Sequence, residues 1–224
     1  MARNKKSDSE GALANSMTDL MTSLAVVFIL LLVAYLNQAY MENKRRADRY
    51  KQLMGHSRTV KSDLIGKFHS LNIEANADPK DPLAVVIPIS EAKIQFDRGK
   101  SEIKPVGKQC LREFVPQLAS IICSNGFSDD VESVLIEGHT DTDGEDEQNL
   151  RLSQDRSYAV LRCVLNECAL GEDQRGRLLD LVSANGRGER HPILASQHED
   201  KVASRRVVFK IRVKSVEQKH VVLG

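Results

Sequence analysis

A single carboxylate, Asp19, lies within the most apolar part of the 224-residue chain. The stretch over residues 15–36 reads NSMTDLMTSLAVVFILLLVAYL. In a helix, Asp19, Thr22 and Ser23 fall on one polar stripe with three other side chains, within an arc of about 160°. An intramembrane charge of this kind is costly unless it faces protein or water, which makes Asp19 a candidate ion carrier. The alternative is an interfacial carboxylate that suits the positive end of the helix dipole.

The apolar run predicts a retained membrane-spanning helix over residues 13–40. About 20 apolar residues span a bilayer, and residues 24–34 contain no polar side chain that would mark a soluble amphipathic helix. A cleaved signal peptide is the alternative, but it needs small residues at a cleavage site after a shorter apolar core. Bulky and polar residues, YLNQAY, follow here instead, which favours a retained anchor.

Basic side chains flank the predicted anchor unequally. The polar arm over residues 1–12 has three of them, whereas residues 41–51 have five. Counted alone, this bias places the side that follows the anchor in the cytoplasm.

Composition and cysteine spacing restrict the class of function. The net charge is +1, aromatic residues make up 4% and tryptophan is absent, which argues against nucleic acid as a partner. No CxxC spacing occurs, so a zinc site is not expected. A disulfide from Cys123 to Cys163 or Cys168 and a set of buried free thiols are both open interpretations. The four cysteines are Cys110, Cys123, Cys163 and Cys168.

The remainder of the chain divides at a turn-rich segment, NADPKDP, over residues 76–82. Residues 41–82 end with this break. They are predicted to form a helical stalk or linker, because apolar residues recur with helical spacing in their second half. Residues 83–214 are predicted to form one folded domain, and residues 215–224 a short tail.

Hydrophobic periodicity within residues 83–214 predicts an α+β fold of the order βαβαββ, with two helices packed on one face of a mixed sheet. Asn149 is the expected N-cap of the second helix. The predicted helices cover residues 105–123 and 149–167. The predicted strands cover residues 83–89, 93–96, 131–137, 179–184 and 206–213.

Four separated motifs follow one another in this part of the chain. They are FDRGKSEIKP at 96–105, EGHTDTDGEDEQNLRLSQDR at 137–156, GRGERHP at 186–192 and SRRV at 204–207. Together they resemble the OmpA-like peptidoglycan-binding domain, and four motifs in order are more specific than one short pattern. Ser204 departs from the family, which often has Asn at this position.

An N-terminal anchor that reads MTDLMTSL, added to such a domain, resembles the MotB group of ion-driven motor subunits. Within that group the chain is most similar to the B subunits of Zorya anti-phage defence systems. The resemblance implies a single-pass inner-membrane protein with a cytoplasmic N-terminus and a periplasmic C-terminal domain, against the count of basic residues. It also implies a dimer of this chain inside a ring of a MotA-like multi-pass subunit.

The implied function is that of an ion-driven motor or channel subunit anchored to peptidoglycan, with the proton as the expected ion. In it Asp19 carries the ion, and Thr22 and Ser23 help to coordinate it. A flagellar-type stator subunit and a passive tether without ion transport are the alternatives. No motif places a set of catalytic side chains, so an enzyme is not expected.

The implied ligand of the domain is the peptidoglycan stem peptide, typically with diaminopimelate, whose side chain ends in an ammonium and a carboxylate. The resemblance assigns the ammonium to Asp141 and the carboxylate to Arg156, since arginine offers a planar fork to carboxylates. The alternative is a structural Asp–Arg salt bridge. The full implied set is Thr140, Asp141, Asn149, Leu152, Arg156 and Arg205.

The acidic run around His139 does not predict a metal site. An EF-hand loop needs glycine at its sixth position, whereas Gly144 is fourth counted from Asp141. Gly186 and Gly188 open no predicted helix, so no dinucleotide fingerprint is expected. The sequence therefore predicts no metal and no cofactor.

Overall fold

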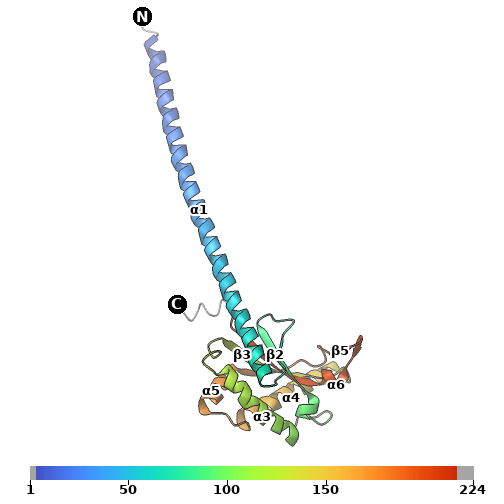
Figure 1. The fold of residues 1–224 in the computed structure, drawn as a ribbon. Helices are drawn as coiled ribbons and strands as arrows, with labels where there is room; N and C mark the ends of the chain where they lie inside the picture. Colours follow the sequence, from blue (N-terminus) through green and yellow to red (C-terminus); the bar gives the residue numbers. More distant parts are fainter. Residues whose placement is uncertain (1–3, 216–224) are drawn as a thin grey trace. The chain divides into compact units, whose positions relative to one another are not determined.

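A computed structural model describes the backbone of residues 4–215 and the side chains of residues 20–48 and 55–215. The chain divides into two compact units, Met1–Gln52 and Leu53–Gly224. Helix α1 (Asn4–Ser70) contributes to both units, and the second unit contains all the strands (Figure 1). Each unit is described separately below.

The first unit contains a long apolar portion of α1. Residues Leu20–Asp48 are 29 residues of α1 whose most apolar window of 18 residues has a mean hydropathy of 2.3, and none of that window is buried in the chain. By length and composition this helix can cross a membrane. Asp19 lies in the helical backbone directly before it, but the Asp19 side chain is outside the described residues.

The second unit is built on a mixed sheet with the strand order β1-β2-β7-β3-β4. Strands β3 and β4 are parallel, whereas the other neighbouring pairs are antiparallel. A separate small hairpin joins β5 (Leu194–Ala195) and β6 (His198–Glu199). The sheet strands are β1 (Asn76–Ala77), β2 (Ala84–Ser90), β3 (Val131–His139), β4 (Val182–Gly186) and β7 (Arg206–Val213).

Strand β7 shows why the sequence pattern produces this sheet. Its apolar residues Val207, Phe209 and Ile211 are buried in the core, because successive side chains of a strand point to opposite faces. Lys210 lies on the other face, where its ammonium pairs with Asp78 at 2.6 Å. The predicted strand over residues 206–213 is confirmed.

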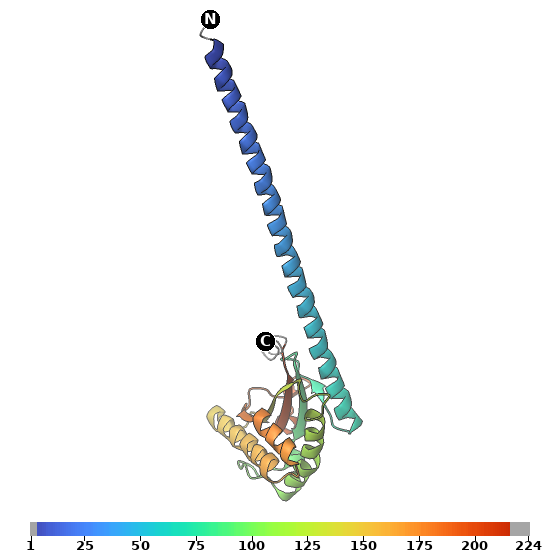
Figure 2. The same cartoon turned by 90° about the vertical axis from the view of Figure 1, so that its left-hand side faces the viewer.

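Three longer helices pack with the sheet around one hydrophobic core (Figure 2). Helix α3 places Phe114 against Phe209 of β7, with ring centroids 5.0 Å apart, and α4 adds Val160 and Val164. The α+β class and the mixed sheet are therefore confirmed. The helices of this unit after α1 are α2 (Glu91–Ile94), α3 (Pro105–Ile122), α4 (Asp146–Asn166), α5 (Glu172–Leu181) and α6 (Lys201–Ser204).

Two predicted strands were wrong in part. Residues 93–96 lie in and after the short helix α2, and only Phe96 makes an isolated bridge, to Ile103. The reason is close packing of α2 on α3: a Cβ at Gly107 would lie 1.6 Å from the Ile94 carbonyl oxygen. Residues 179–181 end helix α5, whose Leu178 and Leu181 are buried at helical spacing, and the strand begins only at residue 182.

Helix α4 begins earlier than predicted. Glu145 occupies the N-cap, so Asn149 lies inside the first turn of the helix and not at its cap. The Asn149 side chain instead donates to the preceding loop, where the carbonyl oxygen of Asp143 is 3.1 Å away. A contact with the loop that precedes the helix therefore takes the place of the predicted N-cap.

The last turns of α1 belong to the core of the second unit. Val60, Leu64 and Phe68 are buried at spacings of four residues, in the same cluster as the sheet and helices. Ser57 also donates to the carbonyl oxygen of Lys214 at 3.2 Å. The end of the predicted stalk thus forms part of the hydrophobic core that the sheet requires.

All four cysteines are free thiols in this structure. Cys163, near the end of α4, is in hydrogen-bonding contact with Cys168, whereas Cys123 follows the end of α3. The suggested disulfide from Cys123 to Cys163 or Cys168 is therefore not formed, and Cys168 Sγ donates instead to the carbonyl oxygen of Leu111 at 3.6 Å.

Candidate binding site

A pocket of about 700 Å³ lies beside the end of β3 and the first half of α4. All six residues predicted for the ligand site line it, although they come from two motifs that are far apart in the sequence. The predicted residues in its lining are Thr140, Asp141, Asn149, Leu152, Arg156 and Arg205. The fold thus brings these six side chains together around one cavity.

Two glycines allow α4 to lie directly on the sheet beside the pocket. A Cβ at Gly138 on β3 would lie 2.1 Å from the carbonyl oxygen of Ser153, and one at Gly186 on β4 would lie 2.5 Å from the nitrogen of Gln154. Real side chains do not fit at such distances. This close approach holds α4 on the sheet so that Arg156 faces the same pocket as Asp141.

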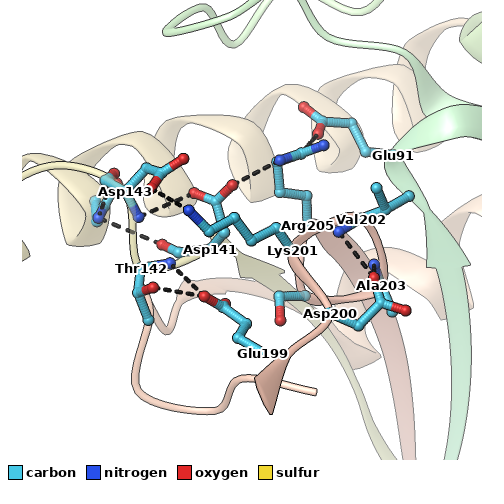
Figure 3. A network of polar contacts seen from close by, with 12 residues as sticks. Glu91, Asp141, Thr142, Asp143, Glu199, Asp200, Lys201, Val202, Ala203 and Arg205 are labelled. Atoms are coloured by element: carbon cyan, nitrogen blue, oxygen red, sulfur yellow. Dashed lines mark hydrogen bonds and ion pairs between the residues drawn. The ribbon is translucent and has the colours of Figure 1, made fainter. Parts of the chain in front are cut away.

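Asp141 and Arg156 are connected through two intermediate side chains. The Arg156 Nη2 lies 2.9 Å from Glu91 Oε1, and Arg205 Nε lies 2.7 Å from Glu91 Oε2. Arg205 Nη1 in turn lies 2.6 Å from Asp141 Oδ2 (Figure 3). The four groups form a chain of alternating charge. Within the described residues, the alternative of a direct Asp141–Arg156 salt bridge is not formed.

Arg156 is held firmly at one end of this chain. Its side chain is 5% exposed, and it donates to the carbonyl oxygens of Lys100 at 3.0 Å and Asp97 at 3.3 Å. Its guanidinium lies over the Phe96 ring, 4.8 Å from the centroid. Burial lowers the pKa of Arg156, and the nearby Glu91 carboxylate opposes this change. Arginine stays protonated in proteins, so the pocket keeps a fixed cation.

Arg205 is positioned by the short helix α6. Asp200 caps this helix by accepting from the backbone nitrogens of Val202 and Ala203 at 3.1 and 3.0 Å (Figure 3). Arg205 follows at the C-cap, and its hydrogen bond to Asp141 raises the pKa of its guanidinium. The second cation of the pocket thus comes from the start of β7.

The loop between β3 and α4 is tied on several sides. The Asn149 amide donates to Glu189 Oε2 at 2.6 Å, and Lys201 Nζ lies 2.6 Å from Asp143 Oδ1. The Thr140 backbone donates to the Gly188 carbonyl oxygen at 3.1 Å. The buried Thr140 hydroxyl has no hydrogen-bond partner in the described part of the chain. A ligand or water in the pocket can satisfy that group.

The predicted ion-carrying residues belong to the other unit of the chain. Thr22 and Ser23 lie on the exposed surface of α1. The side chain of Asp19 is outside the described residues. The structure therefore locates these three positions on one helix, α1.

Sequence reasoning missed several residues of the pocket, above all Glu91. Phe96 and Arg98 also line it and occur within a recognised motif, but nothing in their spacing pairs them with Arg156. Glu91 lies in no motif at all. Its position beside Arg156 depends on the pairing of β2 with β7, so no local signal identifies it.

Two relatives resemble the chain along most of its length. It is 28% identical over 211 residues to Zorya protein ZorB of Escherichia coli, covering 88% of this chain and 86% of the relative. It is 24% identical over 215 residues to Zorya protein ZorB of Escherichia coli O139:H28, covering 91% and 81%. At these coverages the alignments extend beyond residues 83–214.

The fold has a counterpart among solved structures. A putative MotB-like protein from Desulfovibrio vulgaris superposes with a TM-score of 0.51 at 20% identity, over 74% of this chain and 99% of that one. The OmpA family model matches residues 95–206, half of the chain and the segment that contributes nearly all of the pocket. The chain therefore belongs to the OmpA family.

Proposed function

We propose that this chain is a peptidoglycan-anchored, stator-like subunit of an ion-driven machine in the inner membrane. The observation that carries the proposal is the pocket in which Asp141 and Arg156 present opposite charges to one cavity. Membership of the OmpA family supports the wall as the ligand. Similarity to ZorB along 88% of the chain supports a role in anti-phage defence.

The pocket suits the end of a diaminopimelate side chain. Arg156 offers a guanidinium fork to its carboxylate, and Asp141 accepts its ammonium. The volume of about 700 Å³ is within the range of small-ligand sites. The buried Thr140 hydroxyl supplies a further polar partner, and the partly exposed Arg205 lines the cavity beside Asp141. The remaining members of the predicted set, Asn149 and Leu152, shape the wall of the cavity.

The apolar helix Leu20–Asp48 supports a single-pass membrane protein. A domain that binds peptidoglycan works on the periplasmic side, so the N-terminus lies in the cytoplasm. In this arrangement a MotA-like multi-pass subunit forms a ring around a dimer of this chain. The ring is needed because one helix cannot enclose an ion path alone. Asp19 carries a proton along this path, and Thr22 and Ser23 help to coordinate it.

The wall-binding part of the proposal is tested with the full chain in detergent and purified sacculi. Asp141→Ala and Arg156→Ala each remove one half of the clamp, which typically costs about 2–5 kcal/mol for a desolvated charge pair. We expect both variants to lose co-sedimentation with sacculi while circular dichroism stays that of the wild type.

Matched controls come from helix α4 itself. Asp155→Ala and Arg162→Ala remove the same charges from exposed positions outside this pocket. These controls should co-sediment like the wild type. Unchanged co-sedimentation of both pocket variants would contradict the proposed site.

A further inference from the structure

We infer that Glu91 and Arg205 set the specificity of this pocket for a ligand end that carries both a carboxylate and an ammonium. The inference rests on the proposed function, and it assigns to Glu91 a role that no sequence motif indicates. The two side chains act as an internal counterpart of such a ligand, as their contacts show.

Each of the two side chains occupies the position that the matching ligand group requires. The Glu91 carboxylate lies on Arg156, 2.9 Å from its Nη2, where a ligand carboxylate would bind. The Arg205 guanidinium lies on Asp141, 2.6 Å from its Oδ2, where a ligand ammonium would bind. The pair is thus a built-in zwitterion that occupies both ends of the clamp.

Exposure separates the fixed groups from the displaceable ones. The side chains of Arg156 and Asp141 are 5% and 10% exposed, whereas those of Glu91 and Arg205 are 18% and 34% exposed. Arg156 is further anchored by the carbonyl oxygen of Lys100. A ligand therefore displaces the outer pair, Glu91 and Arg205, more readily than it moves the inner pair, Arg156 and Asp141.

Glu91 and Arg205 stay together when they leave the clamp. Their own ion pair measures 2.7 Å, and the Glu91 backbone nitrogen donates to the Arg205 carbonyl oxygen at 3.0 Å. The antiparallel pairing of β2 and β7, which sets Ser90 opposite Arg206, fixes this proximity. Displacement by a ligand thus leaves Glu91 and Arg205 neutralising each other.

Charge balance then selects the ligand. Arg156, Glu91, Arg205 and Asp141 sum to zero, so a zwitterionic end leaves every charge paired when it replaces the internal pair. A ligand with only a carboxylate or only an ammonium leaves one unpaired charge in a partly buried site, which is unfavourable. Removing Glu91 or Arg205 unbalances the site by one charge and should change the preferred ligand accordingly.

The test uses the full chain in detergent and three N-acetylated stem tripeptides measured by calorimetry. Their third residues are diaminopimelate, lysine, which lacks the side-chain carboxylate, and 2-aminopimelate, which lacks the side-chain ammonium. The wild type should bind the diaminopimelate peptide at least about tenfold more tightly than the other two, the effect of one charge-assisted hydrogen bond.

Two variants should shift this preference in opposite directions. In Glu91→Gln the pocket gains one positive charge, so the 2-aminopimelate peptide should gain about tenfold relative to the diaminopimelate peptide. In Arg205→Gln the lysine peptide should gain by a similar factor. Arg205→Lys keeps the charge and should keep the wild-type preference, and Glu113→Gln on α3 is the matched surface control.

The outcomes separate the two proposals. If the wild type binds neither the diaminopimelate peptide nor sacculi, the proposed function fails and this inference fails with it. If the wild type binds but both charge variants keep its order of preference, only the specificity role of Glu91 and Arg205 is overturned. The two variants are independent, so misfolding of one, seen by circular dichroism, leaves the other to decide.

Discussion

The two ends of helix α1 share one secondary structure but differ in what surrounds them. Large apolar side chains of the Leu20–Asp48 portion are exposed within the chain, as Phe28 is at 66%. Near the other end, Phe68 is fully buried. The first portion needs lipid or a partner to cover its apolar surface, whereas the second is covered by the domain that follows it. A long helix can therefore be stabilised by different environments along its length.

The largest expected effect concerns the first portion. Asp19→Asn keeps the size and polarity of the side chain but removes its ability to ionise. Burial against a partner helix disfavours a charged carboxylate, which is what makes proton uptake and release feasible there. We expect complete loss of biological activity, with membrane insertion, co-purification with the ring subunit and sacculus binding all retained.

Asp19→Glu provides the comparison, because it still titrates and should keep part of the activity. Activity is measured as protection of cells against phage infection. Full protection by the Asn variant would refute ion carriage and leave the passive tether. Loss of co-purification would instead show that Asp19 is structural.

The next effect concerns where the second unit begins. A soluble fragment that starts at Leu83 lacks the three buried side chains Val60, Leu64 and Phe68. Burial of each such side chain contributes about 1.5–3 kcal/mol, so their sum approaches the whole stability of a small domain. We expect this fragment to aggregate or to lose its cooperative thermal transition, and a fragment from Leu53 to fold.

Differential scanning calorimetry of both fragments decides the matter. Cooperative transitions at equal temperatures would mean that the end of α1 is dispensable. That result would contradict its inclusion in the core.

A smaller effect compares one residue type in the two portions. Phe68→Ala should lower the free energy of unfolding of the domain by about 3–5 kcal/mol, because it leaves a cavity. Phe28→Ala, its matched control in the first portion, should change it by less than about 0.5 kcal/mol. Urea titration of the full chain in detergent, read by pulse proteolysis of the domain, measures both. Equal effects would remove the distinction between the two portions.

The local hydrophobic pattern predicted a helix or strand correctly where one face of that element is buried against the same core along its length. The alternation in residues 206–213 predicted β7 with the observed bounds. The pattern failed where a short element is shaped by its neighbour, as α2 is by the close approach at Gly107. It also failed at the end of α5, where residues 179–181, with the buried Leu181, were included in a predicted strand.

The residues of the candidate site likewise divide into those that the sequence identified and those that only the tertiary structure identified. The family motifs named six residues that line one pocket. Five of them lie within residues 140–156, where the turn after a strand and the first turns of the next helix are close in sequence as well as in space, and Arg205 comes from a separate motif. They did not name Glu91, since its contacts with Arg156 and Arg205 join residues 65 and 114 positions apart. By itself, the sequence determined the long apolar helix, the sheet class and the presence of Asp141 and Arg156 at one pocket. Only the tertiary structure decided that the pairing of β2 with β7 places a carboxylate and a guanidinium between them, because ion pairs between distant residues depend on strand register and not on spacing.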